Sequence, residues 1–353
     1  MKPLLHPRLD WLDQARGVVI LVLIVSMGTA EYAGDLLTGA SVLGPPMLNH
    51  GYDYFEGTPP IITFVDSGQA MFVFIMGLVG YGAFVSRLRK RGRRSSLLYA
   101  ARRVILLYAI SALDAILLSS LVDGHPNWPD FFYKGTFAGI ALGALAAFVA
   151  VSLWPRTGPR MVVGTILILA HAVLFEFPLF DHRGWGDDGL NLPAFPFMAL
   201  GMCAMAVMGS CFGQWIHENP DGLDDVFRRR ITPITLWAII GAYCMDWLQP
   251  AAHHDATAAL QLQAMAIGGV NIMIFYSLGR LGIRLPVLSA LGRNLLLMFL
   301  ISGIAVAIYM DLLPKASLIP SPFLTVTLIG IFPMVAMRLL AMLLAKRGIM
   351  VLP

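Results

Sequence analysis

The chain has 353 residues, of which 58% are hydrophobic and only 13% are charged, whereas soluble domains carry about 25% charged residues. Its mean hydropathy is +0.73 and its formal net charge is +4. This composition excludes an ordinary soluble globular protein and predicts a polytopic membrane protein. The excess positive charge then belongs to loops that face anionic lipid, and we expect no nucleic-acid partner.

Ten apolar segments are long enough to cross a bilayer, which takes roughly 20 residues each. In chain order we expect membrane spans at residues 17–33, 61–86, 104–122, 131–154, 161–177, 192–216, 231–248, 257–278, 291–312 and 323–345. The longest connection between them is about 25 residues, too short for a separate domain. The sequence therefore predicts one all-α membrane domain over residues 1–353.

Lys and Arg residues gather in alternate connections between these spans. With the N-terminus in the cytoplasm, all of the 25 Lys and Arg residues except Lys134, Arg183 and Lys315 fall on the inner side. The inner connections include a basic loop over residues 87–103, a tight turn over residues 156–160 and a loop that ends at Arg230. The positive-inside rule therefore predicts that both termini are cytoplasmic.

Histidines favour the opposite, outer side of the predicted topology. Five of the eight lie there, namely His50, His125, His182, His253 and His254. Because imidazole changes its charge near neutral pH, this face is a candidate seat for chemistry. His253, His254 and Asp255 have the composition of half a metal site, but no second cluster has matching spacing, so we predict no metal.

Several small or polar residues interrupt the apolar spans. Gly77, Gly209 and Gly213 belong to runs with small residues four apart, which predict closely packed helices. Asp114 and Asp246 are ionisable groups inside predicted spans. Such groups most often hold helices together, and the alternative is that they line a substrate cavity.

Three segments resemble one family of membrane enzymes. Residues 8–17 (RLDWLDQARG) run into the first span, residues 66–77 (DSGQAMFVFIMG) begin the second span, and residues 291–296 (LGRNLL) lie late in the chain. In this order and spacing they resemble the transmembrane acyltransferase family of heparan-α-glucosaminide N-acetyltransferase and its bacterial relatives. Ser26 stands where that family commonly has Asn, and Ala70 stands where it has Pro.

The resemblance implies an acyltransferase of a bacterial inner membrane. In such an enzyme, cytosolic acetyl-CoA, or another acyl-CoA, donates its acyl group to an amino sugar or other glycan acceptor on the outer side of the membrane. It also implies a homodimer embedded among membrane lipids.

The same resemblance assigns roles to particular residues. His50 is the only histidine in the loop between the first two spans, and we expect it to act as the base or as the acyl carrier. The alternative is a solvated loop histidine. Asp66 would orient that imidazole, and its alternative role is a carboxylate that stabilises the start of a helix. Guanidinium groups bind phosphate well, so residues at inner span ends are expected at the donor nucleotide, namely Arg16, Arg102, Arg103, Arg293 and Asn294. On the substrate side we expect Ser26, Asp114 and Asp246.

Two other classes of protein fit the same spans. A transporter or exporter without catalysis would also have many spans and intramembrane carboxylates, although the sequence contains no inverted repeat. A structural partner of an envelope-building complex, with decayed catalytic residues, is the third alternative.

Overall fold

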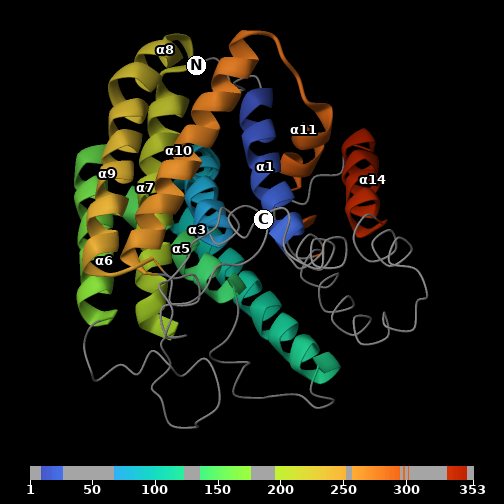
Figure 1. The fold of residues 1–353 in the computed structure, drawn as a ribbon, viewed down its shortest axis with the longest axis horizontal. Coiled ribbons are helices and arrows are strands. Elements are labelled where there is room, and N and C mark those ends of the chain that lie inside the picture. The colour runs from blue at the N-terminus through green and yellow to red at the C-terminus, as the bar shows by residue number, and fades with distance from the viewer. Residues whose placement is uncertain are drawn as a thin grey trace.

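The computed structural model describes residues 9–26, 67–122, 136–175, 195–251, 257–294, 297–298, 301 and 332–347. Within these ranges every regular element is a helix, which confirms the predicted all-α class (Figure 1). The main helices are α1 (Asp10–Ser26), α3 (Gly68–Val122), α5 (Thr136–Leu153), α6 (Thr157–Phe175), α7 (Phe195–Glu218), α9 (Thr232–Leu248), α10 (Ala258–Arg280), α11 (Pro286–Arg293) and α14 (Phe332–Lys346).

Five helical stretches in the described residues are long and apolar enough to cross a membrane. They are Gly68–Leu113, Thr157–Leu174, Ala199–Glu218, Pro220–Leu248 and Ala258–Arg280, and shorter apolar helices cover Ala138–Leu153 and Val335–Leu344. This result is compatible with an integral membrane protein. The total of ten spans stays a prediction from the sequence.

Helix α7 forms the centre of the bundle, and α6 and α9 lie at its outside. In the apolar window of α7, 89% of the residues are buried, against 22% in the span of α6 and 17% in the span that contains α9. The outward side chains of α6 and α9 are large and apolar, such as Leu169 and Trp237. Apolar side chains that face outward along whole helices are what a lipid environment requires.

Glycines bring α7 into backbone contact with α3. A Cβ atom added to Gly77 would lie 2.1 Å from the carbonyl oxygen of Ala206, and one added to Gly209 would lie 2.0 Å from that of Phe74. Neither position has room for a side chain, so the small residues set the distance between the helices. The close packing predicted from the glycine spacing is therefore present.

The predicted basic loop over residues 87–103 is wrong, because this segment is helical. Helix α3 runs through it and is interrupted only at Gly92, whose φ of 76° and ψ of 172° suit glycine alone. The guanidinium carbon of Arg87 lies 3.8 Å from the ring centroid of Tyr99, so the two arms of α3, residues 68–91 and 93–122, fold back on each other. Arg and Lys are good helix formers, which explains why a run of positive charge continues the helix.

The predicted loop between the sixth and seventh spans is also helical. It consists of a 3₁₀ turn and two short helices, η1 (Pro220–Gly222), α8 (Leu223–Val226) and the π-helical η2 (Phe227–Ile231), which leads directly into α9. Asp225 pairs with Arg228 at 3.2 Å and with Arg229 at 2.7 Å. These pairs, three and four residues apart, stabilise the helical turns locally.

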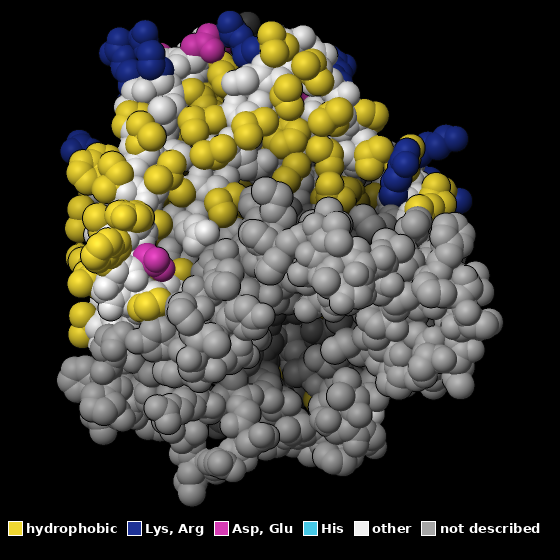
Figure 2. Space-filling view, viewed as in Figure 1, with side chains coloured by type: hydrophobic (Ala, Val, Ile, Leu, Met, Phe, Trp, Pro, Cys, Tyr) yellow, Lys and Arg dark blue, Asp and Glu magenta, His cyan; other side chains and the backbone are white. Residues whose placement is uncertain are grey.

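Basic side chains gather at one end of the bundle, where α8 lies next to the ends of α7 and α10. Figure 2 shows Lys and Arg side chains along this end and hydrophobic side chains below it on the described surface. We call this the basic end, and it includes the start of α1, η1 to η2, the end of α10 and the whole of α11. Basic residues from separate parts of the sequence thus lie together at one end of the described bundle.

Candidate functional site

Two of the segments that carry the family resemblance meet at the basic end. A Cβ atom added to Gly292 of α11 would lie 1.8 Å from the carbonyl oxygen of Asp13, and one added to Gly17 of α1 would lie 2.0 Å from that of Leu288. The backbone N–H of Leu285 donates to Gln14 Oε1 at 3.3 Å, across 271 residues of sequence. The start of α1 and α11 therefore form one closely packed unit.

Four charged side chains of this unit form a cluster around the buried carboxylate of one of them, Asp13. The side chain of Asp13 is only 4% exposed, and its Oδ1 accepts a hydrogen bond from Arg16 Nη1 at 3.0 Å. Arg293 Nε lies 3.9 Å from Asp13 Oδ2, and Arg293 Nη2 lies 3.8 Å from Asp10 Oδ1. Burial of a charged group is costly unless it is paired, and the two arginines supply this pairing. We call Asp10, Asp13, Arg16 and Arg293 the Asp13 cluster.

Helix α10 fixes the position of this cluster. Asn271 is buried and its Nδ2 donates to the carbonyl oxygen of Ala15 at 2.8 Å. On the same helix, a Cβ atom added to Gly279 would lie 3.0 Å from Cβ of Trp11. The first two turns of α1 are thus held between α10 and α11, and the Asp13 cluster lies on a rigid support.

The five residues predicted at the donor nucleotide fall into three groups. Arg16 and Arg293 meet in the Asp13 cluster, and Asn294 is buried where α11 ends. Arg103 lies on the second arm of α3, close enough to Arg16 for their charges to repel each other. Arg102 is exposed on the same arm and is not part of the cluster.

The predicted catalytic and substrate residues are described only in part. His50 and Asp66 lie outside the described residues, and the side chains of Ser26 and Asp114 do as well, although both residues belong to helices. Asp246 is exposed near the end of α9, and its Oδ1 accepts a hydrogen bond from the backbone N–H of Ala251 at 2.8 Å. The structure thus gives Asp246 a local role in the turn that follows α9.

A second polar cluster lies inside the bundle, centred on a fully buried arginine. Arg160 of α6 is 0% exposed, donates from Nη1 to Ser210 Oγ at 2.8 Å and donates from Nη2 to Gln214 Oε1. Gln214 Nε2 donates to Glu218 Oε2 at 2.9 Å, and the hydroxyl of Tyr81 donates to Glu218 Oε1 at 2.8 Å. This network, the Arg160 network, joins α3, α6 and α7.

The Arg160 network was not predicted from the sequence, in which Arg160 was interpreted only as a topology-setting charge in an inner turn. One signal was available. Ser210, Gln214 and Glu218 are spaced four residues apart in an otherwise apolar span, so they share one face of α7. A polar stripe on a helix as buried as α7 requires polar partners from neighbouring helices.

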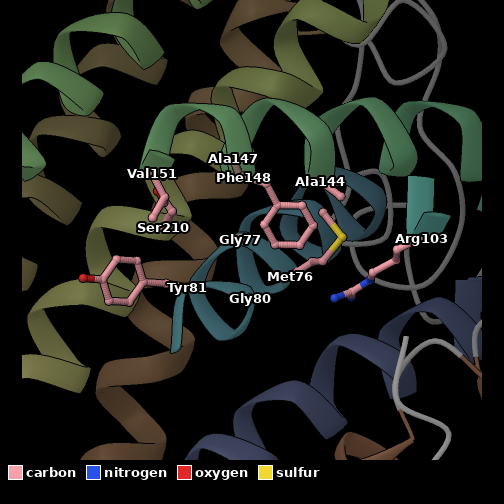
Figure 3. A pocket seen from close by; sticks show the side chains of 10 residues that line it. All are labelled: Met76, Gly77, Gly80, Tyr81, Arg103, Ala144, Ala147, Phe148, Val151 and Ser210. Atoms are coloured by element: carbon pink, nitrogen blue, oxygen red, sulfur yellow. The ribbon is translucent and has the colours of Figure 1, made fainter. Parts of the chain in front are cut away.

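A narrow pocket lies beside the Arg160 network, between α3, α5 and α7 (Figure 3). It is tight, with a volume of about 10 Å³, which is room for about one water molecule, and most of its lining is apolar. Tyr81 and Ser210 line one part of it, while Arg103 extends into it from the opposite side (Figure 3). We call it the Arg103 pocket.

A wider pocket opens at the basic end, between α1, η1, α8 and α10. Its volume is about 250 Å³, and Trp11 of the first resembling segment lines it. Asp224 accepts hydrogen bonds from the hydroxyl of Tyr276 at 2.7 Å and from Arg280 Nη1 at 2.6 Å. The rings of Tyr276 and Phe227 stack at 4.1 Å. The start of α1 is therefore accessible through an open pocket whose surroundings are aromatic and charged.

No protein-family model matches the chain, and no curated protein matches it either. Within the described ranges, no group of three or more His, Cys, Asp or Glu residues is placed to hold a metal ion. The evidence for function is therefore the residues themselves and the three segments that carry the resemblance.

Proposed function

We propose that this protein is a membrane acyltransferase that takes an acyl group, most simply acetyl, from cytosolic acyl-CoA and transfers it to a glycan acceptor on the other side of the membrane. We further propose that the membrane is a bacterial inner membrane and that the enzyme works as a homodimer. The single observation that carries the proposal is the close packing of residues 9–17 against residues 291–294 at the basic end.

The Asp13 cluster supports a donor site for phosphate groups. Arg293 is 37% exposed and is held at 3.8 to 3.9 Å from two carboxylates, so its guanidinium is oriented but still accessible. Planar guanidinium groups bind phosphate through paired hydrogen bonds. Arg16, fixed by Asp13, adds positive charge behind it, and the open pocket beside Trp11 gives a nucleotide room to approach.

The proposed sidedness follows from charge. Under the positive-inside rule the basic end faces the cytoplasm, which is where coenzyme A is available. The acceptor then enters from the far side of a hydrocarbon core about 30 Å thick. The extended arm of coenzyme A spans only part of that distance, so we place the reacting carbon toward the outer leaflet, within reach of His50.

The proposed chemistry needs one base and one leaving group. His50 removes the proton from the acceptor amine or hydroxyl, the acceptor attacks the thioester carbonyl carbon, and the carbon–sulfur bond breaks to release the coenzyme A thiolate, which takes up a proton. In a two-step route, His50 carries the acyl group first and the acceptor attacks afterwards. Asp66 orients the imidazole and stabilises its cation.

Donor binding is tested with the full-length protein purified in detergent. Coenzyme A or acetyl-CoA should raise its thermal stability, because a ligand at 100 times its Kd stabilises the folded state by about 2.7 kcal/mol. Arg293→Gln should abolish this shift. Arg94→Gln, which removes an exposed charge at the tip of α3, should keep it. No shift at millimolar coenzyme A would overturn the proposal and favour a transporter.

Catalysis is tested separately with radiolabelled acetyl-CoA and an extract of envelope glycans. His50→Ala should keep the thermal shift with coenzyme A and lose transfer of label to the glycans. Transfer at the wild-type rate by His50→Ala would remove this residue from the mechanism. If the wild-type protein binds coenzyme A but transfers no label to the glycans, the proposed donor site would be retained and the proposed enzyme activity would be wrong.

A further inference from the structure

Helix α14 has one buried face and one exposed face. Met337 and Ala341 are buried in the core, and among the described helices α14 packs against α11. The side chains on its other side are exposed, namely Val335, Arg338, Leu339, Met342 and Leu343. We call these five residues the exposed face of α14. Figure 1 shows α14 at the edge of the bundle, and Figure 2 shows basic and hydrophobic side chains next to each other there.

Arg338 is the one charged residue of this exposed face. It lies inside an apolar stretch of helix that covers Val335–Leu344. Val335 comes three residues before it and Met342 four residues after it, so both lie on the same side of the helix as Arg338. The guanidinium group therefore has apolar neighbours on a surface that is expected to contact lipid.

No carboxylate of the described residues is placed to neutralise Arg338. Neither α11 nor α14 contains an acidic residue, and no hydrogen bond or ion pair joins Arg338 to another residue that the structure describes. An arginine at membrane depth is costly unless it finds a partner. A second copy of α14 on this face would bring another Arg338 and no carboxylate, so pairing of two α14 helices would not remove the cost.

The position of Arg338 along α14 is below the expected membrane surface. Lys346 and Arg347 are exposed at the end of the helix, and under the positive-inside rule they face the cytoplasm. Arg338 comes eight residues before Lys346, which is about 12 Å along the helix. The Cα–Cβ bond of a helical residue tilts toward the helix N-terminus, which here is away from the cytoplasm. A phosphate drawn inward from the leaflet is therefore the nearest partner that the lipid supplies.

We propose that the exposed face of α14 binds an anionic phospholipid from the cytoplasmic leaflet, with the phosphate on Arg338 and an acyl chain along Val335. A planar guanidinium group binds phosphate through paired hydrogen bonds. Lys346 and Arg347 lie on the head-group side of that phosphate, and their charges favour a lipid with net negative charge. A free phosphate ion would leave the apolar neighbours of Arg338 uncovered, whereas a lipid covers them. This inference does not rest on the proposed acyltransferase activity.

The test is native mass spectrometry of the full-length protein, titrated in detergent with dioleoyl-phosphatidylglycerol or dioleoyl-phosphatidylcholine. We expect tighter binding of phosphatidylglycerol. Arg338→Gln should weaken that binding about tenfold or more, as expected for loss of a charge-assisted hydrogen bond. Arg338→Lys keeps the charge without the planar fork and should bind with intermediate affinity. Arg89→Gln, which removes an exposed charge at the tip of α3, should leave the affinity unchanged.

Equilibrium unfolding in mixed micelles with SDS separates a lipid contact from a structural role of Arg338. Because Arg338 has no polar contact with the described residues, Arg338→Leu without added lipid should unfold at the wild-type SDS concentration or higher. Added phosphatidylglycerol should stabilise the wild-type protein more than Arg338→Leu, because a ligand stabilises the folded state to which it binds.

Several results would overturn the proposal. These are equal binding of the two lipids, unchanged phosphatidylglycerol binding by Arg338→Gln, an equal loss in Arg89→Gln, displacement of bound phosphatidylglycerol by inorganic phosphate at matched concentration, or lower stability of Arg338→Leu in the absence of lipid. If Arg338→Gln converts a dimer to monomers in the same mass spectra, Arg338 belongs to a contact between subunits and the lipid site is wrong.

Discussion

The contact between α3 and α7 gives the most direct test of the packing. In Gly77→Ala, the new Cβ atom would lie 2.1 Å from the carbonyl oxygen of Ala206, whereas real Cβ atoms stay at least 3.0 Å from other heavy atoms. The helices must therefore separate by about 0.9 Å, and neither partner can yield, because both are helical backbone. Overpacking of this kind costs about 1–3 kcal/mol, and the loss extends to the neighbouring contact of Gly209.

Gly80→Ala is the matched control, since it lies one turn further along the same helix and its Cβ atom would meet Phe148 at an ordinary 3.8 Å. This variant should gain up to about 1 kcal/mol from the better helix propensity of alanine. Equilibrium unfolding in mixed micelles with increasing SDS would measure both variants. If Gly77→Ala is as stable as Gly80→Ala, the close approach of α3 and α7 is not as described.

Substitutions at three further positions, Gly92, Arg160 and Tyr81, test other parts of the fold by the same unfolding assay. In Gly92→Ala the added Cβ atom meets no atom within 4 Å. The backbone φ of 76° and ψ of 172° should still strain alanine and lower the free energy of unfolding by about 1–3 kcal/mol. An unchanged free energy of unfolding would argue against the hairpin turn. Arg160→Leu removes the donors to Ser210 and Gln214 and should lower the free energy of unfolding by about 3 kcal/mol. Arg160→Lys should recover less than half of this loss, because one ammonium group cannot reproduce the two-pronged guanidinium. Full recovery by lysine would contradict the network. Tyr81→Phe deletes the hydrogen bond to Glu218 and should cost about 1–2 kcal/mol. If this bond is the cause, the loss should vanish when Glu218 is already replaced by Leu, which has no acceptor.

Hydrophobic runs predicted the helices well where burial in lipid is the dominant force. The predicted spans 231–248 and 257–278 match α9 and α10 within two residues at each end. The connections were predicted less well. Residues 87–103 have the charge of a loop, yet Arg and Lys favour helices, and a single glycine makes the turn. Hydropathy indicates which residues lie in lipid, but it does not indicate at which residue a helix ends.

For the candidate site, the resemblance indicated which residues belong together, and the structure places Arg16 and Arg293 around the same carboxylate. Arg160 was missed because its burial depends on a contact with α7, about 50 residues further along the chain. Local sequence cannot distinguish an arginine that faces the cytoplasm from one that is covered by a neighbouring helix. The polar stripe on α7 is the only part of the Arg160 network that can be recognised from the sequence.

The turn at Gly92 has a practical consequence for imaging a protein this small. Both arms of α3 continue as helices up to that residue, Gly92 itself is exposed, and nothing lies within 4 Å of the position its side chain would occupy. A compact helical domain spliced in at this point through two unbroken helices would be carried rigidly by the bundle, and would serve as a fiducial for electron cryomicroscopy without touching either pocket.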